Sequence, residues 1–472
     1  VFNNVLQSPL VEPEAEARST QSNRFIGASW NSVLTDRLVM VSRAGFQEIF
    51  LGLDPQSCQW DPNCSFTPGE IDLLSGISRG NFTSQSRTYR RSFEFSGHLE
   101  WFKDTKSFGS HAVRFGWMAM AAQAPVARTV PGDEILQNLG PEPFRRTQVC
   151  SNDPKLANGE CRSGWLRAAG EGEQLLLSLS DTWKPTRYLT IRPGVAFHRG
   201  FTVTPHLAVT WDATHDGRTA IRAAYNQQVD VGFLALASLL NRQLASRTCD
   251  WDPDAKAYIR NCRSFGGEGA FTVGLPCGPD GRNPDGTSCR TSLRAPRTHE
   301  VVLSAEREVI TGLVAGGDFV YRKFVHQWED LETNAIWNRG GTAVAREGGY
   351  KNGRPEYVFD LATPDAANRR YTSGTAFLRK RQGLFRFQGS YTLSKSQGAT
   401  NDDYITLFLD NPGQAPYYYG PLPDDSRHDI RVLASYSVTP WLSLGTFFGF
   451  ESGGPYNRYG WDPVYGGYSY YY

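Results

Sequence analysis

Apolar and polar residues alternate along several stretches of the chain, which is the pattern of a β-strand with two different faces. In LFRFQGSYTLS, which covers 384–394, Phe385 and Phe387 share one face and Arg386 lies on the other. The same period of two recurs in YLTIRPGVAFH at 188–198. The pattern therefore predicts an all-β fold built from long strands.

About fourteen strand candidates follow one another in pairs along the chain. Several are 10 to 14 residues long. Strands of soluble proteins average about 5–6 residues, whereas a tilted strand that crosses a bilayer needs about 9–11. Strand length therefore favours a transmembrane barrel over a soluble β-sandwich. The pairs are 24–32 with 36–48, 89–102 with 111–121, 173–184 with 187–198, 203–213 with 218–228, 298–308 with 313–328, 370–380 with 384–394, and 427–437 with 441–452.

The connections are short within each pair and long between most pairs. Outer-membrane barrels sort their connections in this way, with short periplasmic turns and long extracellular loops. We therefore expect residues 1–472 to form one transmembrane antiparallel β-barrel domain in a bacterial outer membrane. The long loops, expected to be extracellular, are about 49–88, 122–172, 229–297, 329–369 and 395–426.

The composition fits this class without proving it. Aromatic residues make up 13% of the chain, and the formal net charge is only +1, so nothing indicates a nucleic-acid partner. Because the sequence contains no run of 18 apolar residues, it predicts no transmembrane helix. A barrel strand escapes such a scan, since only every second residue faces lipid.

Eight cysteines fall into four close pairs inside the long loops, and no predicted strand contains a cysteine. A zinc site is the alternative, but there is no CxxC pair and no histidine at ligand spacing. We therefore predict local disulfides, which place the loops in an oxidising compartment. The expected pairs are Cys58 with Cys64, Cys150 with Cys161, Cys249 with Cys262, and Cys277 with Cys289.

Five strand–turn segments carry a family resemblance. They are SLSDTWKPTRYLTIRPGVAFHRG (178–200), VTPHLAVTWDATHDGRTAIRAAYNQ (203–227), THEVVLSAEREVITGLVAGGDFVYRKF (298–324), YTSGTAFLRKRQGLFRFQGSYTLSKS (371–396), and DDSRHDIRVLASYSV (424–438) followed by FESGGPYNRY (450–459). In this order they resemble the barrel of TonB-dependent outer-membrane receptors, in the Oar-like branch with a carboxypeptidase-regulatory-like domain. His206 departs from the pattern, which has Arg there. The motif positions are Asp181, Trp183, Gly194, Pro205, Arg222, Glu300, Tyr321, Arg322, Arg427, His428, Ser452, Gly453, Pro455 and Tyr456.

The resemblance implies a receptor and transporter whose extracellular loops capture a ligand and whose plug domain receives energy from TonB. No segment of this chain resembles a plug or a TonB box. A barrel of this family has 22 strands. We therefore expect about eight strands to be missing, some before Val1 and about four after SGGPYN. A complete smaller barrel that ends in YSYYY (468–472) is the alternative.

No catalytic motif is present, so no enzyme activity and no organic cofactor are expected. One loop region, 249–289, contains Asp250, Asp252 and Asp254 at calcium-like spacing. It lacks the glycine and the glutamate of a calcium-binding loop, which leaves disulfide-closed Asx turns as the simpler interpretation.

Charged residues alternate with the apolar positions of the strands and are expected to line a hydrated lumen or to contact a plug. The alternative function is a structural barrel whose stapled loops anchor other surface components; a passive porin fits less well, because about half of the chain is loop. Expected partners are outer-membrane lipid, TonB through a plug, and an unidentified extracellular ligand or surface protein. The expected inward positions are Arg114, Arg192, Arg222, Glu300, Glu306, Asp318, Arg322 and Arg386.

Overall fold

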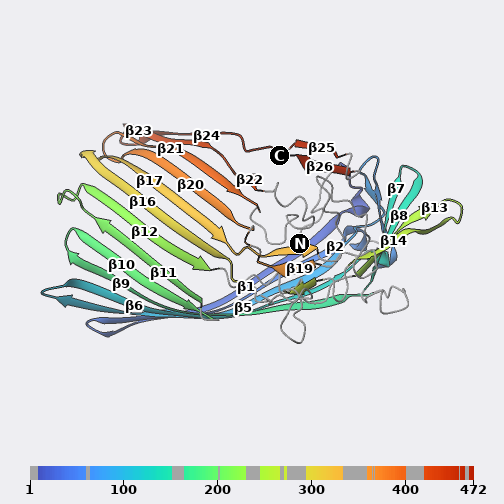
Figure 1. Cartoon of the computed structure of the whole chain (residues 1–472), viewed down its shortest axis with the longest axis horizontal. Coiled ribbons are helices and arrows are strands. Elements are labelled where there is room, and N and C mark those ends of the chain that lie inside the picture. The colour runs from blue at the N-terminus through green and yellow to red at the C-terminus, as the bar shows by residue number, and fades with distance from the viewer. Residues whose placement is uncertain are drawn as a thin grey trace, which may run out of the picture.

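One large antiparallel sheet dominates the computed structural model (Figure 1). The structure describes residues 9–59, 64–150, 164–199, 202–229, 245–265, 271–273, 294–332, 359–363, 365, 367–399, 419–456, 458–462 and 467–471. Fourteen strands of the sheet follow one another in chain order. They are β1 (Ala17–Thr35), β2 (Leu38–Pro55), β5 (Gln85–Thr105), β6 (Gly109–Thr129), β9 (Leu166–Thr186), β10 (Leu189–His198), β11 (Thr202–Trp211), β12 (Thr219–Val229), β16 (Arg297–Ile310), β17 (Leu313–Val325), β20 (Arg369–Lys380), β21 (Phe385–Gly398), β23 (His428–Thr439) and β24 (Leu442–Glu451).

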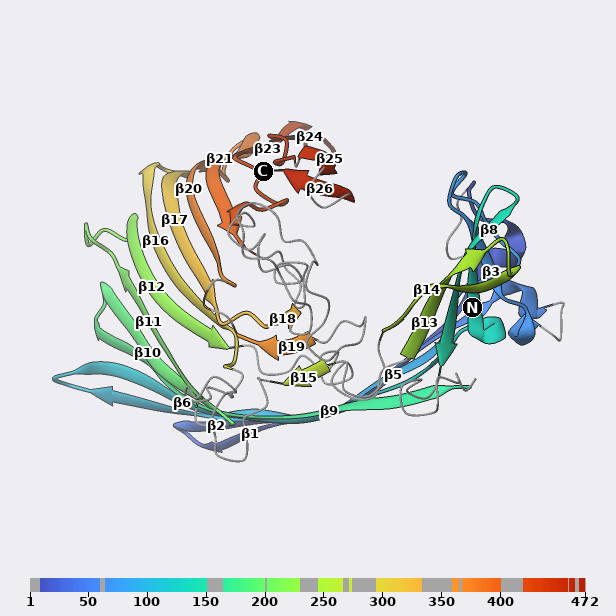
Figure 2. The ribbon, with the colours of Figure 1, turned by 45° about the vertical axis from the view of Figure 1, so that its right-hand side comes forward.

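Every predicted strand is present, in the predicted order, and each pairs with its chain neighbours. This confirms the all-β antiparallel fold. The short β22 (Gly420–Pro421) joins beside β21. Strands β1 and β24 are the two ends of the path, and within the described ranges they do not pair with each other. Figure 2 shows the sheet curving from β1 round to β24 as a trough.

Five strands are much longer than the sequence predicts. β1 and β2 have 19 and 18 residues, and β5, β6 and β9 have 21 each. At about 3.3 Å per residue, 21 residues extend roughly 70 Å, which is far more than a bilayer needs. The predicted loops 49–88 and 122–172 are therefore partly strand. Their ends, such as the polar QSRT that opens β5, lack the alternation that marks the lipid-crossing part.

The register separates the sheet into an apolar face and a polar face, because residues paired across antiparallel strands point to the same side. Leu179 pairs with Phe115 on one side and Val195 on the other. An exposed apolar surface this extended is unstable in water and suits lipid. Large side chains of the apolar face include Phe95, Phe115, Leu175, Leu177, Leu179, Phe197, Leu207, Trp211, Leu303, Phe319, Tyr391, Leu393, Leu444 and Phe448.

Three of the predicted loops combine into a second sheet, which the sequence did not predict. The six strands run in the order β14–β13–β8–β7–β3–β4. We call this the loop sheet; Figure 2 shows it at the far end of β5 and β9, on the side toward which the large sheet curves. Its strands are β3 (Gly69–Asp72), β4 (Ser78–Arg79), β7 (Glu134–Leu139), β8 (Glu142–Cys150), β13 (Ala245–Asp252) and β14 (Ala257–Phe265).

The remaining elements are short. β15 (Phe271–Val273), β19 (Phe359–Ala362) and β18 (Glu329–Glu332) form a three-stranded sheet, and β25 (Arg458–Asp462) pairs with β26 (Gly467–Tyr471). Single 3-10 turns occur at η1 (Pro13–Ala15), η2 (Gln56–Gln59), η3 (Cys64–Phe66) and η4 (Pro131–Asp133). No helix in the described ranges is both long and apolar enough to cross a membrane.

Disulfides join Cys58 to Cys64 and Cys249 to Cys262. Cys161, Cys277 and Cys289 lie outside the described residues. The predicted loops that hold the cysteines contain strands of their own: Cys150 ends β8, Cys249 lies in β13 and Cys262 lies in β14. These strands belong to short polar hairpins, where no apolar face exists to produce an alternating pattern.

Candidate functional site

The loop sheet is the first part of the candidate site, and its second and third loops are joined strand to strand. β8 pairs with β13 over six residues of each. Arg145 Nε donates a hydrogen bond to Asp250 Oδ1 at 2.8 Å, and both side chains are about three-quarters buried. Beside them the hydroxyls of Thr147 and Thr248 lie 3.0 Å apart. The backbone ladder and the ion pair together fix the two loops to each other.

The first loop is attached to the second through Asp72. β3 and β7 run parallel, with Asp72 opposite Asn138. The carboxylate of Asp72 accepts hydrogen bonds from Ser75 Oγ at 2.6 Å, from Gly140 N at 2.9 Å and from Leu74 N at 3.0 Å. The Ser75 hydroxyl, followed by the Gly140 and Leu74 amides, lowers the pKa of Asp72 to about 2.

Asn81 organises the first loop from inside. Its side chain is buried, Oδ1 accepts a hydrogen bond from Ser57 Oγ at 2.9 Å, and Nδ2 donates to the carbonyls of Cys64 at 2.5 Å and Thr67 at 2.9 Å. The Cys58–Cys64 disulfide closes the same turn. Sequence reasoning missed this residue, since nothing in the stretch NFT shows that the amide is enclosed.

The β13–β14 hairpin presents two aromatic side chains beside an arginine of β8. Trp251 and Tyr258 meet edge to face with their ring centroids 4.9 Å apart, and the Arg146 guanidinium lies 5.2 Å from the centre of the Tyr258 ring. Desolvation by burial raises the pKa of Tyr258. Aromatic and arginine side chains on a fixed backbone are the usual anchors of a recognition surface.

Two of the three aspartates with calcium-like spacing have carboxylates engaged in other contacts. Asp250 binds Arg145 and accepts a hydrogen bond from Asn261 Nδ2 at 3.0 Å. Asp252 Oδ1 accepts the backbone amides of Asp254 and Ala255 at 2.9 and 3.0 Å, which is an Asx turn. Among the described residues no group of three or more metal-ligating side chains gathers. Calcium in the region 249–289 stays a prediction, because residues 274–293 lie outside the description.

The polar face of the large sheet is the second part of the candidate site. By register, all eight expected inward positions lie on this face, opposite the apolar one. Glu306 accepts hydrogen bonds from Arg222 at 2.6 Å and from Arg379 at 2.5 Å. Arg322 pairs with Glu300 on the neighbouring strand. Arg379 was not among the expected residues, although the same alternation places it on this face.

A cavity of about 380 Å³ lies on the polar face where β1, β2 and β5 meet. Arg43 and Glu94 contribute opposite charges to its wall, Gln47 adds an amide, and Phe25 covers one side. The Phe25 ring lies over Gly27, where a Cβ would come within 2.8 Å of it. The wall therefore offers donors and acceptors of both charge signs to a ligand in the lumen.

At the long-loop rim, Asp425 holds the turn that enters β23. It is buried, accepts a hydrogen bond from Ser396 N at 2.6 Å and pairs with the motif residue Arg427 at 2.8 Å. The backbone amide of His428 donates to Ser452 Oγ at 3.1 Å, and the His428 ring bonds the Tyr391 hydroxyl at 2.9 Å. The motif residues Arg427, His428 and Ser452 therefore meet at one place, around an aspartate that was not singled out from the sequence.

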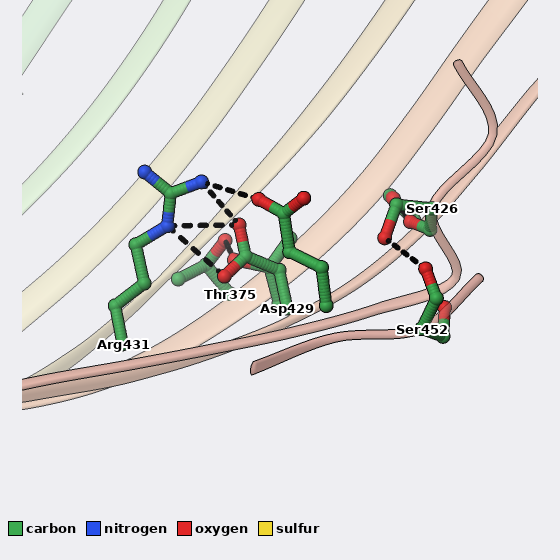
Figure 3. Close-up of polar contacts among 8 residues, drawn as sticks. Thr375, Ser426, Asp429, Arg431 and Ser452 are labelled. Carbon is green, nitrogen blue, oxygen red and sulfur yellow. Dashed lines mark hydrogen bonds and ion pairs between the residues drawn. The ribbon is translucent and has the colours of Figure 1, made fainter. Parts of the chain in front are cut away.

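Beside this rim a polar cluster continues along the strands (Figure 3). Arg431 Nε donates to both oxygens of Asp429 at 3.0 and 3.1 Å, and Arg431 Nη2 donates to Glu451 at 2.8 Å. Ser426 Oγ donates to the Ser452 carbonyl at 3.2 Å. Thr375 and Thr392 share a hydrogen bond of 2.9 Å on the same face. The cluster joins the facing sides of β20, β21, β23 and β24.

The other motif positions lie apart from these contacts. Asp181 and Trp183 lie on the apolar face near the short turns, where Asp181 bonds His111 at 2.7 Å and Trp183 stacks on the same ring at 5.8 Å. A Cβ at Gly194 would collide with the His206 ring across the strand pair, so a larger residue there would have to displace that ring. Pro205 and Tyr321 also lie on the apolar face. Gly453, Pro455 and the exposed Tyr456 come directly after β24 in the chain.

Comparison with known families decides the class. A family model described as an outer membrane beta barrel domain matches residues 198–454, more than half of the chain. The chain belongs to this outer membrane β-barrel family. The protein is therefore an outer-membrane barrel whose apolar face meets lipid. No curated protein matches it in sequence.

Solved structures agree in fold. The chain is similar to the outer membrane transporter YddB from Escherichia coli, with a TM-score of 0.62 and 13% identity over 94% of this chain and 52% of that one. It is also similar to the pyoverdine outer membrane receptor FpvA from Pseudomonas aeruginosa PAO1, with a TM-score of 0.53 and 8% identity over 97% and 54%. It is similar as well to the siderophore receptor PiuA from Acinetobacter baumannii, with a TM-score of 0.50 and 10% identity over 95% of this chain and 56% of that one. The chain therefore spans about half the length of these proteins.

Proposed function

We propose that this barrel is part of an outer-membrane receptor for uptake, in which the loop sheet captures a ligand outside the cell. The observation that carries the proposal is the position of the loop sheet: it lies at the long-loop end of β5 and β9, on the side toward which the large sheet curves (Figure 2). A ligand held there has the polar face below it. Energy for the transfer comes from TonB through a plug, as in the family that the motifs resemble.

The charge arrangement supports passage of a polar ligand. Glu306 is bound by two arginines, and Arg431 is bound by two carboxylates, so the polar face carries closely spaced charges of both signs. Charges that neutralise each other in this way leave no strong net field to trap a ligand of either sign. This favours a receptor for a large polar compound over a channel that selects small anions or small cations.

A second function, a scaffold for other surface components, is favoured by the joining of the loops. Three loops share one sheet, and the Cys249–Cys262 disulfide crosses the outer hairpin of that sheet. A fixed surface of this kind binds a protein partner without the loss of loop entropy that a mobile loop suffers. Transport and scaffolding therefore differ in what the loop sheet holds, which an uptake experiment distinguishes.

The test uses a deletion strain that expresses the native full-length gene product or a variant with residues 245–265 replaced by a short Gly/Ser linker. Growth is measured with iron chelates, peptides or oligosaccharides as the limiting nutrient, with and without functional TonB. The proposal predicts one nutrient class whose uptake needs the gene, TonB and the hairpin, while the variant barrel still reaches the outer membrane. Uptake that is unchanged for every class, together with loss of surface proteins from the deletion strain, would support the scaffold.

A further inference from the structure

A cavity of about 800 Å³ lies on the outside of the barrel wall, away from the loop sheet and the polar face. It is formed by the extended ends of β5, β6 and β9, beyond the last large apolar residues of the lipid-facing surface. We call it the outer pocket. The lining residues are Arg87, Tyr89, Pro125, Val126, Ala127, Trp165, Arg167 and Ala169.

The register gives the outer pocket a small-residue floor between two cations. Arg87 pairs with Ala127, and Ala127 pairs in turn with Arg167. The two arginines are therefore two strand spacings apart, about 10 Å, with only a methyl group between them. In the next row Pro125 pairs with Ala169, so the floor stays shallow there as well.

One of the two arginines of the outer pocket is held in place by its neighbours, beside the Trp165 ring. Arg87 Nη2 donates to Asp54 Oδ1 at 3.0 Å, and its guanidinium lies 5.4 Å from the centre of the Trp165 ring. Trp165 is 38% exposed, so part of the indole remains free. Arg167 is exposed and makes no ion pair with any residue that the structure describes. One arginine is thus held in position, and the other is available to a ligand.

The height of the outer pocket matches the headgroup region of a bilayer. On β5, β6 and β9 the row of Phe93 and Ala121 carries the last large apolar residue of this face, while Phe50 of β2 packs against Tyr89 two rows nearer the outer pocket. The Arg87 row is six residues further along β5, about 20 Å of strand, or about 14 Å of height at a 45° tilt. Glu173 lies in the Phe93 row and pairs with Arg199, and Glu171, one row nearer the outer pocket, accepts a hydrogen bond from Gln123 at 3.2 Å, so both carboxylates are engaged.

We propose that the outer pocket binds the phosphorylated saccharide headgroup of a glycolipid in the outer leaflet. Guanidinium groups match phosphate oxygens with paired hydrogen bonds. Flat rings such as Trp165 and Tyr89 offer an apolar surface with polar edges to a sugar. The outer pocket continues the lipid-contacting face upward, so the acyl chains of the same molecule can lie against Phe93 and Phe95. The assignment rests on the long-loop side being extracellular, and it does not depend on transport.

The experiment measures glycolipid retention by native mass spectrometry of the full-length protein purified in detergent. The probes are a diphosphorylated lipid A-type glycolipid, its dephosphorylated form, and glucosamine phosphate without acyl chains. The test variant is Arg87→Gln with Arg167→Gln, and the matched control is Arg37→Gln with Arg381→Gln, two exposed arginines in short turns at the opposite end. Heat-modifiable gel mobility reports whether each variant still folds as a barrel.

The wild type and the control are expected to retain the diphosphorylated glycolipid, and the test variant to bind it about 10-fold or more weakly. Trp165→Ala should weaken both the phosphorylated and the dephosphorylated glycolipid, since it removes a surface for the sugar. Equal retention by the test variant and the wild type would overturn the assignment. Binding of glucosamine phosphate as tight as that of the glycolipid would replace a membrane lipid with a soluble sugar phosphate as the occupant.

Discussion

The joining of the loops depends on the contact between Arg145 and Asp250, which tie the second loop to the third. The Nε–Oδ1 distance is 2.8 Å, and the side chains are 25% and 22% exposed, so the pair is neither fully solvated nor fully buried. A charged hydrogen bond contributes about 1.5–3 kcal/mol, and an exposed ion pair about 0.2–1 kcal/mol. We therefore expect a coupling energy of about 1–2 kcal/mol. At about 1.4 kcal/mol per factor of ten, that coupling corresponds to a factor of about 5–30 in the opening equilibrium of the β13–β14 hairpin.

A double-mutant cycle with Arg145→Ala and Asp250→Ala measures this energy. Amide hydrogen exchange of β13 and β14 in the purified barrel reports the opening of the hairpin. Asp250 also accepts a hydrogen bond from Asn261, so its single substitution should cost more than that of Arg145, and only the cycle isolates the pair. Lys256→Ala is the control, because Lys256 is an exposed cation in the turn of the same hairpin, away from Asp250, without an ion pair to any described residue. A coupling energy near zero, or equal effects of Arg145→Ala and Lys256→Ala, would contradict this role of the ion pair.

Three other predictions concern single side chains. Asn81→Ala should speed hydrogen exchange across the first loop by at least tenfold, because it removes the amide donor to the Cys64 and Thr67 carbonyls and the acceptor of the Ser57 hydroxyl; Asn81→Asp should have an intermediate effect. Glu306→Gln should lower the midpoint of heat-modified gel migration, because Arg222 and Arg379 lose the charge between them; an unchanged midpoint would contradict this contribution. The pKa of Asp72 is lowered from 3.8 to about 2, so its stabilising effect should be complete above pH 4 and disappear as the pH falls toward 2. If the Gly140 amide already loses protection at pH 5, relative to its intrinsic exchange rate at that pH, the effect is excluded.

The barrel strands were predictable because lipid enforces a pattern. The pair 298–308 and 313–328 shows alternation on both sides of a short turn, and the structure has β16 at Arg297–Ile310 and β17 at Leu313–Val325. The same alternation is sufficient to place Glu300 and Glu306 on one face. Where β5 and β9 leave the membrane, the pattern ends although the backbone ladder continues, so their ends were predicted too early.

The loop sheet was not predictable from local pattern. β3 has four residues and β4 has two, and β3 pairs in parallel with β7 across Gly69 and Ile135, far apart in the chain. Neither face of these strands is apolar enough to give an alternating signal. The roles of Asp425 and Asn81 depend on enclosure by neighbours from other segments, which sequence spacing does not show.

The orientation of the barrel is tested most directly by the side of the membrane on which each end lies. A short epitope is inserted at Gly76, in the turn between β3 and β4 of the loop sheet, or at Gly383, in the turn between β20 and β21. Antibody binding is then measured on intact and on permeabilised cells. We expect the antibody to bind the Gly76 insertion on intact cells, and to bind the Gly383 insertion only after permeabilisation. The reverse result, or equal binding to both insertions on intact cells, would contradict this orientation.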